Sequence, residues 1–332
     1  MCSLLKKILI AIGATIVAVV LFLAILWLPS FNSPKEIEFG VSFSKSYADY
    51  LELDWKETYL AILDDLGVKS VRLQSDWDKT ELSEGFFDFS VLDWQMAEAE
   101  KRGVKVLLVV GKRQPRWPEC HIPSWLAGMP EVEIQDRTFE FIKTMVLRYK
   151  DSPVLTMWQV ENEPLLNAFG ECSPGDINFL KREIALVKSL DDRPILITDS
   201  GELSTWRKTA HLGDYFGTTI YRRVYSTYFG YFRHFFAPAL YRLKAKMVGL
   251  SPDKVIISEL QAEPWMPDGK ESRGSLEEQK NVMDNEFIKK QIEFAQETRF
   301  LKAYIWGVEW WYWTKTQGDE SVWNIGKSIW QP

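Results

Sequence analysis

The sequence has little of what several classes of protein need. Its 332 residues include 3 cysteines and 3 histidines, too few for a disulfide scaffold and little material for a His-rich metal site. No G-x-G-x-x-G or P-loop motif stands at the first strand–helix turn, as a nucleotide-binding fold often requires. The formal net charge of −6 argues against a protein that binds nucleic acid through its phosphates. We expect no metal, no organic cofactor and no nucleic-acid partner.

Aromatic residues, in contrast, are abundant. The chain contains 15 Trp, 12 Tyr and 19 Phe. A protein core rarely needs so many tryptophans, because each buried indole N–H requires an acceptor. The surplus favours stacking platforms, and sugar rings are one ligand that uses them.

An uncharged run of residues, Ile8–Leu28, lies near the N-terminus. At ~1.5 Å per residue, a helix of this length crosses a ~30 Å hydrocarbon core. Lys6 and Lys7 precede the run, which predicts a cytoplasmic N-terminus and an extracytoplasmic remainder at the cell membrane. The alternative is a cleaved signal peptide, whose apolar region is normally shorter. We expect a cytoplasmic N-terminus (1–7), a single-pass transmembrane signal anchor (8–28), a linker (29–35) and one exported domain (36–332).

The exported part alternates short apolar runs with amphipathic segments. Near-continuous apolar runs are typical of parallel strands that helices cover on the outside. Asp54 and Ser90 are placed as N-caps, and Gly67 and Gly103 as the glycines that end the same two helices. Further helices are predicted over Asp136–Tyr149, Asp176–Leu190, Ala237–Val248 and Leu276–Thr298. The eight predicted strands are Phe39–Phe43, Val68–Leu73, Val104–Val110, Val154–Val160, Pro194–Thr198, Phe216–Tyr221, Val255–Ser258 and Ala303–Val308.

Eight strands in about 300 residues predict a (β/α)8 TIM barrel, with a doubly wound sheet as the runner-up. The active site of such a barrel lies where the strands end at their carboxyl side. Glu163 follows the fourth run and Glu259 follows the seventh, so the two carboxylates are expected on opposite walls of one mouth. Such a pair is what cleavage of a glycosidic bond requires.

The segment Trp158–Pro164 resembles the sequence that ends the fourth strand of the clan A glycoside hydrolases. In that clan an Asn-Glu pair stands there, and the Glu is the acid/base. The resemblance implies that Glu163 is the acid/base and that Asn162 binds the 2-hydroxyl of the sugar. The clan's nucleophile is a Glu that ends the seventh strand, and Ile256–Glu259 resembles that site.

The same resemblance implies further substrate-binding residues. The clan has an arginine on the second strand, matched by Arg72, and often a tyrosine that ends the sixth, matched by Tyr221. A tryptophan after the eighth strand forms the floor of the −1 subsite. Trp306 is the best match and Trp310 is another candidate. Trp117, which follows the third strand, is also expected to contact sugar.

A second pattern, Glu84–Asp93, resembles a sequence that follows the second strand in glycoside hydrolase families 42, 39 and some of family 5. The sequence departs from the clan at Gly111-Lys112, where many relatives have a histidine. The implied function is retaining hydrolysis of a β-glycosidic bond in an extracytoplasmic carbohydrate. A transglycosylase and a non-catalytic glycan-binding protein on the same barrel are the alternatives.

Other interpretations of these residues stay open. In one of them, Glu259 forms an ion pair with Arg72 that has a structural role. In another, Glu263 is the nucleophile in place of Glu259. The arginines and lysines that follow the strands either form a solvated rim or line the cleft and suit an acidic glycan.

The two cysteines of the exported part, Cys120 and Cys172, follow the third and fourth strands by similar intervals. Neighbouring strands of a barrel end ~4.8 Å apart, and a disulfide needs Cα atoms ~4.4–6.8 Å apart. We therefore expect a Cys120–Cys172 disulfide, with two unrelated loop cysteines as the alternative.

Overall fold

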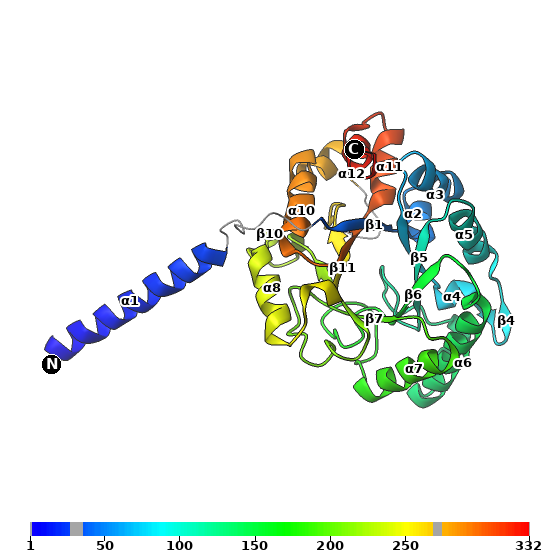
Figure 1. The fold of residues 1–332 in the computed structure, drawn as a ribbon, viewed down its shortest axis with the longest axis horizontal. Coiled ribbons are helices and arrows are strands. Elements are labelled where there is room, and N and C mark those ends of the chain that lie inside the picture. Colours follow the sequence, from blue (N-terminus) through cyan, green and yellow to red (C-terminus); the bar gives the residue numbers. More distant parts are fainter. Residues whose placement is uncertain (1, 27–35, 268–273, 332) are drawn as a thin grey trace.

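The computed structural model describes residues 2–26, 36–267 and 274–331. Its centre is a closed barrel of eight parallel strands in the order β1-β12-β11-β8-β7-β6-β5-β2 (Figure 1). The predicted (β/α)8 fold is confirmed. The barrel strands are β1 (Glu38–Ser42), β2 (Ser70–Gln74), β5 (Lys105–Val110), β6 (Leu155–Val160), β7 (Ile195–Asp199), β8 (Tyr215–Ile220), β11 (Val255–Gln261) and β12 (Lys302–Trp306).

Helices cover the outside of this barrel (Figure 1). Asp54 and Asp176 cap two of them, since their carboxylates accept backbone N–H bonds from the first turn. The expected single helix Leu276–Thr298 is wrong, because Asp284 caps a new helix there. The helices of the barrel domain are α2 (Lys45–Tyr50), α3 (Trp55–Asp64), α4 (Trp77–Thr80), α5 (Ser90–Lys101), α6 (Glu131–Tyr149), α7 (Ile177–Leu190), α8 (Pro238–Met247), α9 (Leu276–Val282), α10 (Asn285–Thr298), α11 (Val308–Thr316) and α12 (Ser321–Trp330).

Two short hairpins decorate the loops. One pairs β3 (Glu81–Ser83) with β4 (Phe86–Phe87), and the other pairs β9 (Arg223–Ser226) with β10 (Gly230–Arg233). Neither was expected from the sequence. Ser90 is the first residue of α5 rather than its cap, and Asp88 accepts the Ser90 backbone N–H at 2.8 Å instead.

The barrel strands have two buried faces that follow the two-residue period of a strand. On β5, Val106, Leu108 and Val110 pack in the large hydrophobic core together with residues of the covering helices. Leu107 and Val109 belong to a second, smaller cluster on the other face, which is the barrel interior. A side chain is therefore directed toward the interior, and the mouth above it, only at alternate strand positions.

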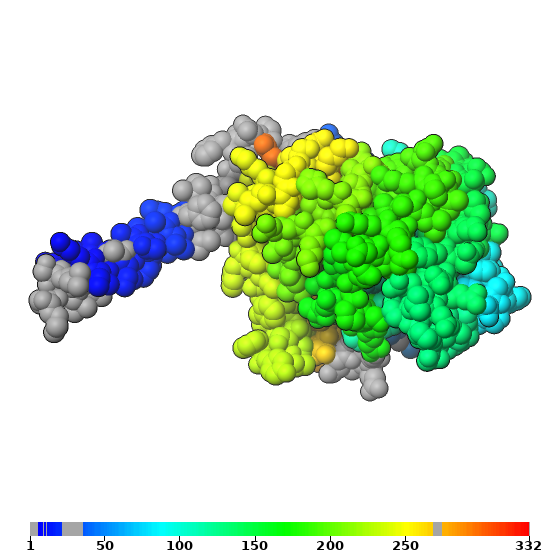
Figure 2. All heavy atoms as spheres, turned by 90° about the horizontal axis from the view of Figure 1, so that it is seen from below, coloured from blue at the N-terminus to red at the C-terminus, as the bar shows by residue number. Residues whose placement is uncertain are grey.

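An N-terminal helix, α1 (Cys2–Leu26), projects away from the barrel (Figures 1 and 2). In the described ranges, no helix meets both the length and the apolarity needed to cross a membrane. The expected linker 29–35 and the end of the expected anchor lie outside the described residues.

Candidate active site

Arg72 on β2 is the centre of a buried polar network inside the barrel. Its neighbours on the strand, Val71 and Leu73, pack outward in the large core, so Arg72 faces inward. The guanidinium donates to Oε1 of Gln159 on β6 at 2.8 Å and to Oε1 of Glu259 on β11 at 3.0 Å. This cation fixes one carboxylate oxygen of Glu259 from across the barrel.

Glu259 faces the interior because of an irregularity in β11. Val255 and Ile257 pack outward in the large core, and strict alternation would turn residue 259 outward as well. The pairing register with β8 and with β12 shifts just after Ile257. This bulge turns Glu259 inward and Leu260 outward, and Leu260 joins the core. The strand continues to Gln261, so Glu259 lies within β11 and not at its end.

Tyr221, directly after β8, binds the other oxygen of the same carboxylate. Its phenolic O–H donates to Oε2 of Glu259 at 2.8 Å. Burial and the negative charge of Glu259 raise the pKa of Tyr221, so this hydroxyl stays a donor. The structure thus brings together Arg72, Tyr221 and Glu259, the three residues expected around the nucleophile.

Glu163 follows β6 in a strained segment. Its φ of 44° lies in the left-handed region, and its backbone N–H donates to Oγ1 of Thr198 at 2.8 Å. Thr219 donates to its carboxyl oxygen at 3.3 Å. Burial raises the pKa of Glu163 well above its usual range, and the charges of Glu259 and Glu119 raise it further. Glu163 is 7% exposed and Glu259 is 4% exposed, so both carboxyl groups are largely shielded from water.

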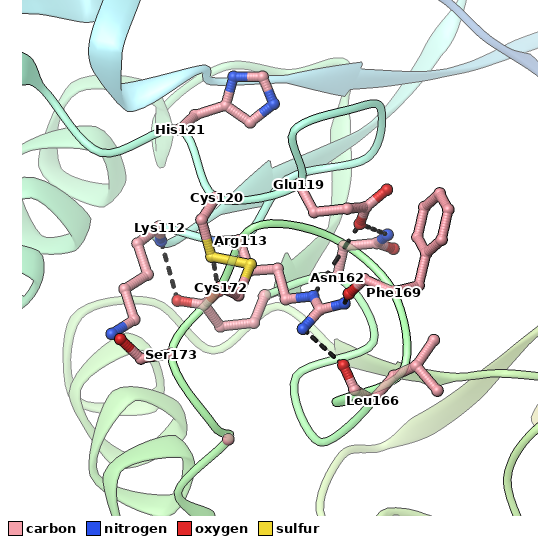
Figure 3. The surroundings of a disulfide bond; sticks show 12 residues. Lys112, Arg113, Glu119, Cys120, His121, Asn162, Leu166, Phe169, Cys172 and Ser173 are labelled. Carbon is pink, nitrogen blue, oxygen red and sulfur yellow. Dashed lines mark hydrogen bonds and ion pairs between the residues drawn. A yellow bond between two sulfur atoms is a disulfide. The ribbon is translucent and has the colours of Figure 1, made fainter. Parts of the chain in front are cut away.

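Asn162 is held from both ends of its amide. Its Oδ1 accepts from Nη2 of Arg72 at 2.8 Å and from Gln159 at 3.1 Å, while its Nδ2 donates to Oε2 of Glu119 at 3.2 Å. Figure 3 shows Asn162 and Glu119 facing each other beside the disulfide. These contacts fix which atom of the amide is the donor.

Glu119 is a third buried carboxyl of the site, and sequence reasoning missed it. Burial raises its pKa to about 8, the charge of Glu259 adds to the rise, and Arg113 opposes it. Glu119 lies on the loop after β5, directly before Cys120. The sequence held one signal for Glu119. It stands directly before Cys120, the cysteine expected to form a disulfide with the neighbouring loop.

Gly111, the departure from the clan pattern after β5, has a structural reason. Its φ is 113°, and a Cβ built there would lie 2.4 Å from Oε1 of Glu161. The Glu161 carboxylate accepts the backbone N–H groups of Lys112 at 2.9 Å and of Arg113 at 2.5 Å. Glu161 therefore fills the space that a larger side chain at position 111 would need, and it holds the start of this loop.

Trp306 ends β12 at the barrel mouth but is 6% exposed. The guanidinium of Arg116 lies 4.1 Å from the centre of a Trp306 ring. Trp306 was expected to form the floor of the −1 subsite, and in the structure the Arg116 cation occupies a face of its indole.

Trp310 was the other candidate for this floor, and the structure places it in the core instead. It is 0% exposed, belongs to the large core, and donates its indole N–H to Gln279 of α9 at 2.7 Å. Position 310 lies on α11, where the helical period directs it into the packing between helices.

Trp117, on the loop after β5, is 44% exposed and begins a row of rings at the mouth. Its ring centre lies 5.7 Å from that of Phe169, which lies 5.6 Å from that of Trp265. Trp265 in turn lies 5.7 Å from Tyr221, the residue that binds Glu259. Rings from the loops after β5, β6 and β11 thus form a row that leads to Tyr221, which binds Glu259.

Glu263 does not take the place of Glu259. It forms a two-point ion pair with Arg116, and one of these contacts, Nη2 to Oε2, is 3.1 Å long.

Other basic residues of the expected rim are also occupied within the protein. Lys112 pairs with Glu131, and Arg113 donates to the carbonyl groups of Leu166 and Phe169. Because these basic side chains already bind groups of the protein, the contacts do not favour an acidic glycan as the substrate.

Cys120 and Cys172 form a disulfide, with Cα atoms 5.3 Å apart (Figure 3). This is the pair expected from the adjacency of the two strands. The bond joins the loop that carries Arg116, Trp117 and Glu119 to the loop that follows Glu163. Both walls of the mouth on this side are therefore covalently linked.

Residues 49–140 match the family model Glyco_hydro_42, described as Beta-galactosidase. The match contains the Glu84–Asp93 pattern and ends before Glu163 and Glu259. Mannan endo-1,4-beta-mannosidase F of Aspergillus fumigatus is 29% identical over 126 residues, which are 36% of this chain and 28% of that protein. The probable enzyme of the same name from Neosartorya fischeri is 28% identical over 129 residues, 36% of this chain and 27% of that protein. The chain thus spans just over a quarter of the length of these curated relatives.

Several solved structures share the fold. GH5_18 from Bifidobacterium longum, in complex with Manβ1-4GlcNAc, has a TM-score of 0.56 at 15% identity, covering 82% of this chain and 68% of that one. A GH42 β-galactosidase from G. stearothermophilus has a TM-score of 0.55 at 14% identity, covering 81% and 50%. Xylanase 10B from Thermotoga petrophila, in complex with xylobiose, has a TM-score of 0.53 at 16% identity, covering 81% and 81%. At these identities the likeness establishes the (β/α)8 fold.

Proposed function

We propose that the chain is a retaining glycosidase that hydrolyses β-glycosidic bonds, with Glu163 as acid/base and Glu259 as nucleophile. One observation carries the proposal: the environments of the two carboxyl groups differ in the way the reaction needs. Arg72 and Tyr221 each bind one oxygen of Glu259, whereas burial and neighbouring negative charge keep the proton on Glu163. Two carboxyl groups in such different environments supply one base and one acid.

The reaction follows in two displacements. An oxygen of Glu259 attacks the anomeric carbon while Glu163 gives its proton to the leaving oxygen, so that a glycosyl–enzyme ester forms and the glycosidic bond breaks. Glu163, now a carboxylate, then takes a proton from water, and the water oxygen attacks the same carbon. The ester bond breaks, and Glu259 is released as a carboxylate. Asn162, whose amide Arg72 and Glu119 orient, binds the 2-hydroxyl of the sugar.

The named activities of the relatives direct the choice of substrate. They include a β-galactosidase and mannan endo-1,4-beta-mannosidases, and one neighbour holds Manβ1-4GlcNAc. We therefore propose β-mannosides and β-galactosides as the first substrates to test, as p-nitrophenyl glycosides.

The two glutamate roles are tested by substitution. Glu163→Gln and Glu259→Gln should each lower kcat by about 10³-fold or more, because each removes a chemical step. Glu163→Ala should retain formation of the ester from an aryl glycoside with a good leaving group, and added azide should restore turnover with a β-glycosyl azide product. Glu133→Gln, an exposed glutamate of α6, is the matched control and should leave kcat unchanged. Full activity of Glu259→Gln would overturn the proposal.

We also propose that the segment Ile8–Leu28 anchors the enzyme in the cell membrane with the barrel outside the cytoplasm. Support comes from the uncharged run, the preceding Lys6 and Lys7, and the exposed apolar side chains of α1, which include Ile10 and Val20. The native protein should stay with membranes during carbonate extraction. A soluble mature protein that begins near Ser30 would contradict the anchor.

A further inference from the structure

Arg116 connects opposite sides of the barrel mouth. It lies on the loop after β5, yet its guanidinium pairs with Glu263, which follows β11, and lies 3.6 Å from Oε2 of Glu309 on α11. It also stacks on two rings, at 3.6 Å from the ring centre of Tyr47 on α2 and at 4.1 Å from a ring centre of Trp306. One side chain therefore joins elements that follow four different barrel strands.

The partners of Arg116 are themselves fixed. Glu309 accepts the backbone N–H of Ser44 at 2.5 Å. Glu263 packs against Gly307, where an added Cβ would lie 2.3 Å from the Cβ of Glu263, and the φ of Gly307 is 104°. Arg116, Glu263 and Glu309 form one charged assembly, and the exposed fraction of each of their side chains is low.

The loop that carries Arg116 is held on both sides. Gln74 of β2 donates to the carbonyl oxygen of Pro115 at 2.6 Å. Arg113 and Cys120 form a β-bridge, and the disulfide to Cys172 follows. The position of Arg116 across the mouth is thus a built feature of the fold.

In the proposed mechanism, the assembly lies on the side of the mouth that would receive the non-leaving sugar. Glu163 protonates the leaving oxygen, so the leaving group lies toward β6. The sugar attacked by Glu259 extends the opposite way, toward β11, β12 and β1, where Glu263, Trp306 and Tyr47 stand. Arg116 and its partners close this direction.

Two buried polar atoms of the assembly lack a hydrogen-bond partner in the described part of the chain. They are Nε of Arg116 and Oε2 of Glu309. Buried polar groups are nearly always hydrogen-bonded, and an exception at a site is a place for a ligand's polar groups. Nε is a donor and Oε2 is an acceptor, and a sugar hydroxyl bonds to groups of both kinds.

We infer that Arg116, Glu263 and Glu309 form the end wall of the glycone subsite and restrict the enzyme to the non-reducing ends of β-linked chains. The unpartnered atoms bind hydroxyl groups of the terminal sugar, and a further sugar beyond it would collide with the ion-paired guanidinium. This inference rests on the proposed glycosidase function, for which it specifies the mode of attack.

The first test uses the wild-type protein and its preference between aryl glycosides. For p-nitrophenyl β-mannoside against p-nitrophenyl β-1,4-mannobioside, and for the galactose pair, kcat/KM should favour the monosaccharide by more than about tenfold. Reduced β-1,4-mannopentaose or galactopentaose should release monosaccharide alone at early times. Early release of di- and trisaccharides would overturn the inference while the proposed function stands, whereas failure to cleave any β-glycoside would overturn the function itself.

The second test removes the wall. Arg116→Ala should narrow the preference for the monosaccharide at least about fivefold, mainly by lowering KM for the disaccharide glycoside. Arg116→Lys, which keeps the charge and much of the stem, should retain more of the preference. Arg102→Ala is the matched control, because Arg102 also pairs with two carboxylates but on the outside of the barrel. An unchanged preference in folded Arg116→Ala would contradict the assignment.

Discussion

Nη1 of Arg72 lies 3.0 Å from Oε1 of Glu259, and both side chains are buried. Removing the cation should leave a buried carboxylate without its counter-ion, which typically costs about 3–5 kcal/mol of stability. We expect Arg72→Ala to lower kcat by about 10²-fold or more, and Arg72→Lys to recover part of the loss. Steady-state kinetics and thermal unfolding of both variants check this. Equal activity of Arg72→Ala and wild type would show that the pair is structural.

The barrel itself was predictable because each parallel strand is buried on both faces and therefore appears as a continuous apolar run. Glu163 and its Asn162 neighbour followed from one local segment. The inward orientation of Glu259 could not be predicted in this way, because it depends on a bulge in β11. The alternating pattern of a strand does not reveal such a bulge. Likewise, the helical packing that buries Trp310 depends on contacts between distant elements.

The polar groups brought in by loops were the least predictable. Glu119 reaches Asn162, and Arg116 reaches Trp306, from one loop whose path depends on the disulfide and on Glu161. No periodicity describes such a loop. The sequence therefore supplied the strand-borne part of the site, while the loop-borne part needed the three-dimensional structure.

Glu119 should influence the pH dependence of activity. Glu163 must be protonated to act as an acid, so kcat/KM should fall as pH rises through the pKa of Glu163. The charge of ionised Glu119 raises that pKa. Glu119→Gln removes the charge, and the alkaline limb of the pH profile should move to lower pH. A limb that stays in place would show that Glu119 does not act on Glu163.

Glu119 should also make the fold less stable in alkali. Its pKa in the folded protein is raised to about 8 from 4.5, so the folded state binds this proton more tightly than the unfolded chain does. The resulting stabilisation is complete below about pH 4.5 and is lost as pH rises through about 8. Thermal unfolding at pH 5, 7 and 9 should show a smaller fall in Tm for Glu119→Gln than for wild type. Parallel curves would contradict the buried, proton-binding state of Glu119.

The Cys120–Cys172 bond should stabilise the domain. It closes a loop with a sequence separation of 52, worth ~4 kcal/mol on the chain-entropy model and less in many measured cases. Cys120→Ser with Cys172→Ser should lower Tm by several degrees, and a reducing agent should do the same to wild type but not to the double variant. Cys2→Ser is the control, because Cys2 lies on α1 outside the barrel. A Tm that changes with neither the double substitution nor the reducing agent would show that the bond does not form in the protein.

The central claim, a covalent intermediate on Glu259, is tested most directly by trapping that intermediate. A 2-deoxy-2-fluoro β-glycoside with a dinitrophenyl leaving group, of the sugar that the enzyme cleaves fastest, should inactivate it and add one glycosyl group. Mass spectrometry of the digested protein is predicted to place that group on Glu259. Labelling of Glu263 or Glu119, or an inverted first product without any label, would contradict the account.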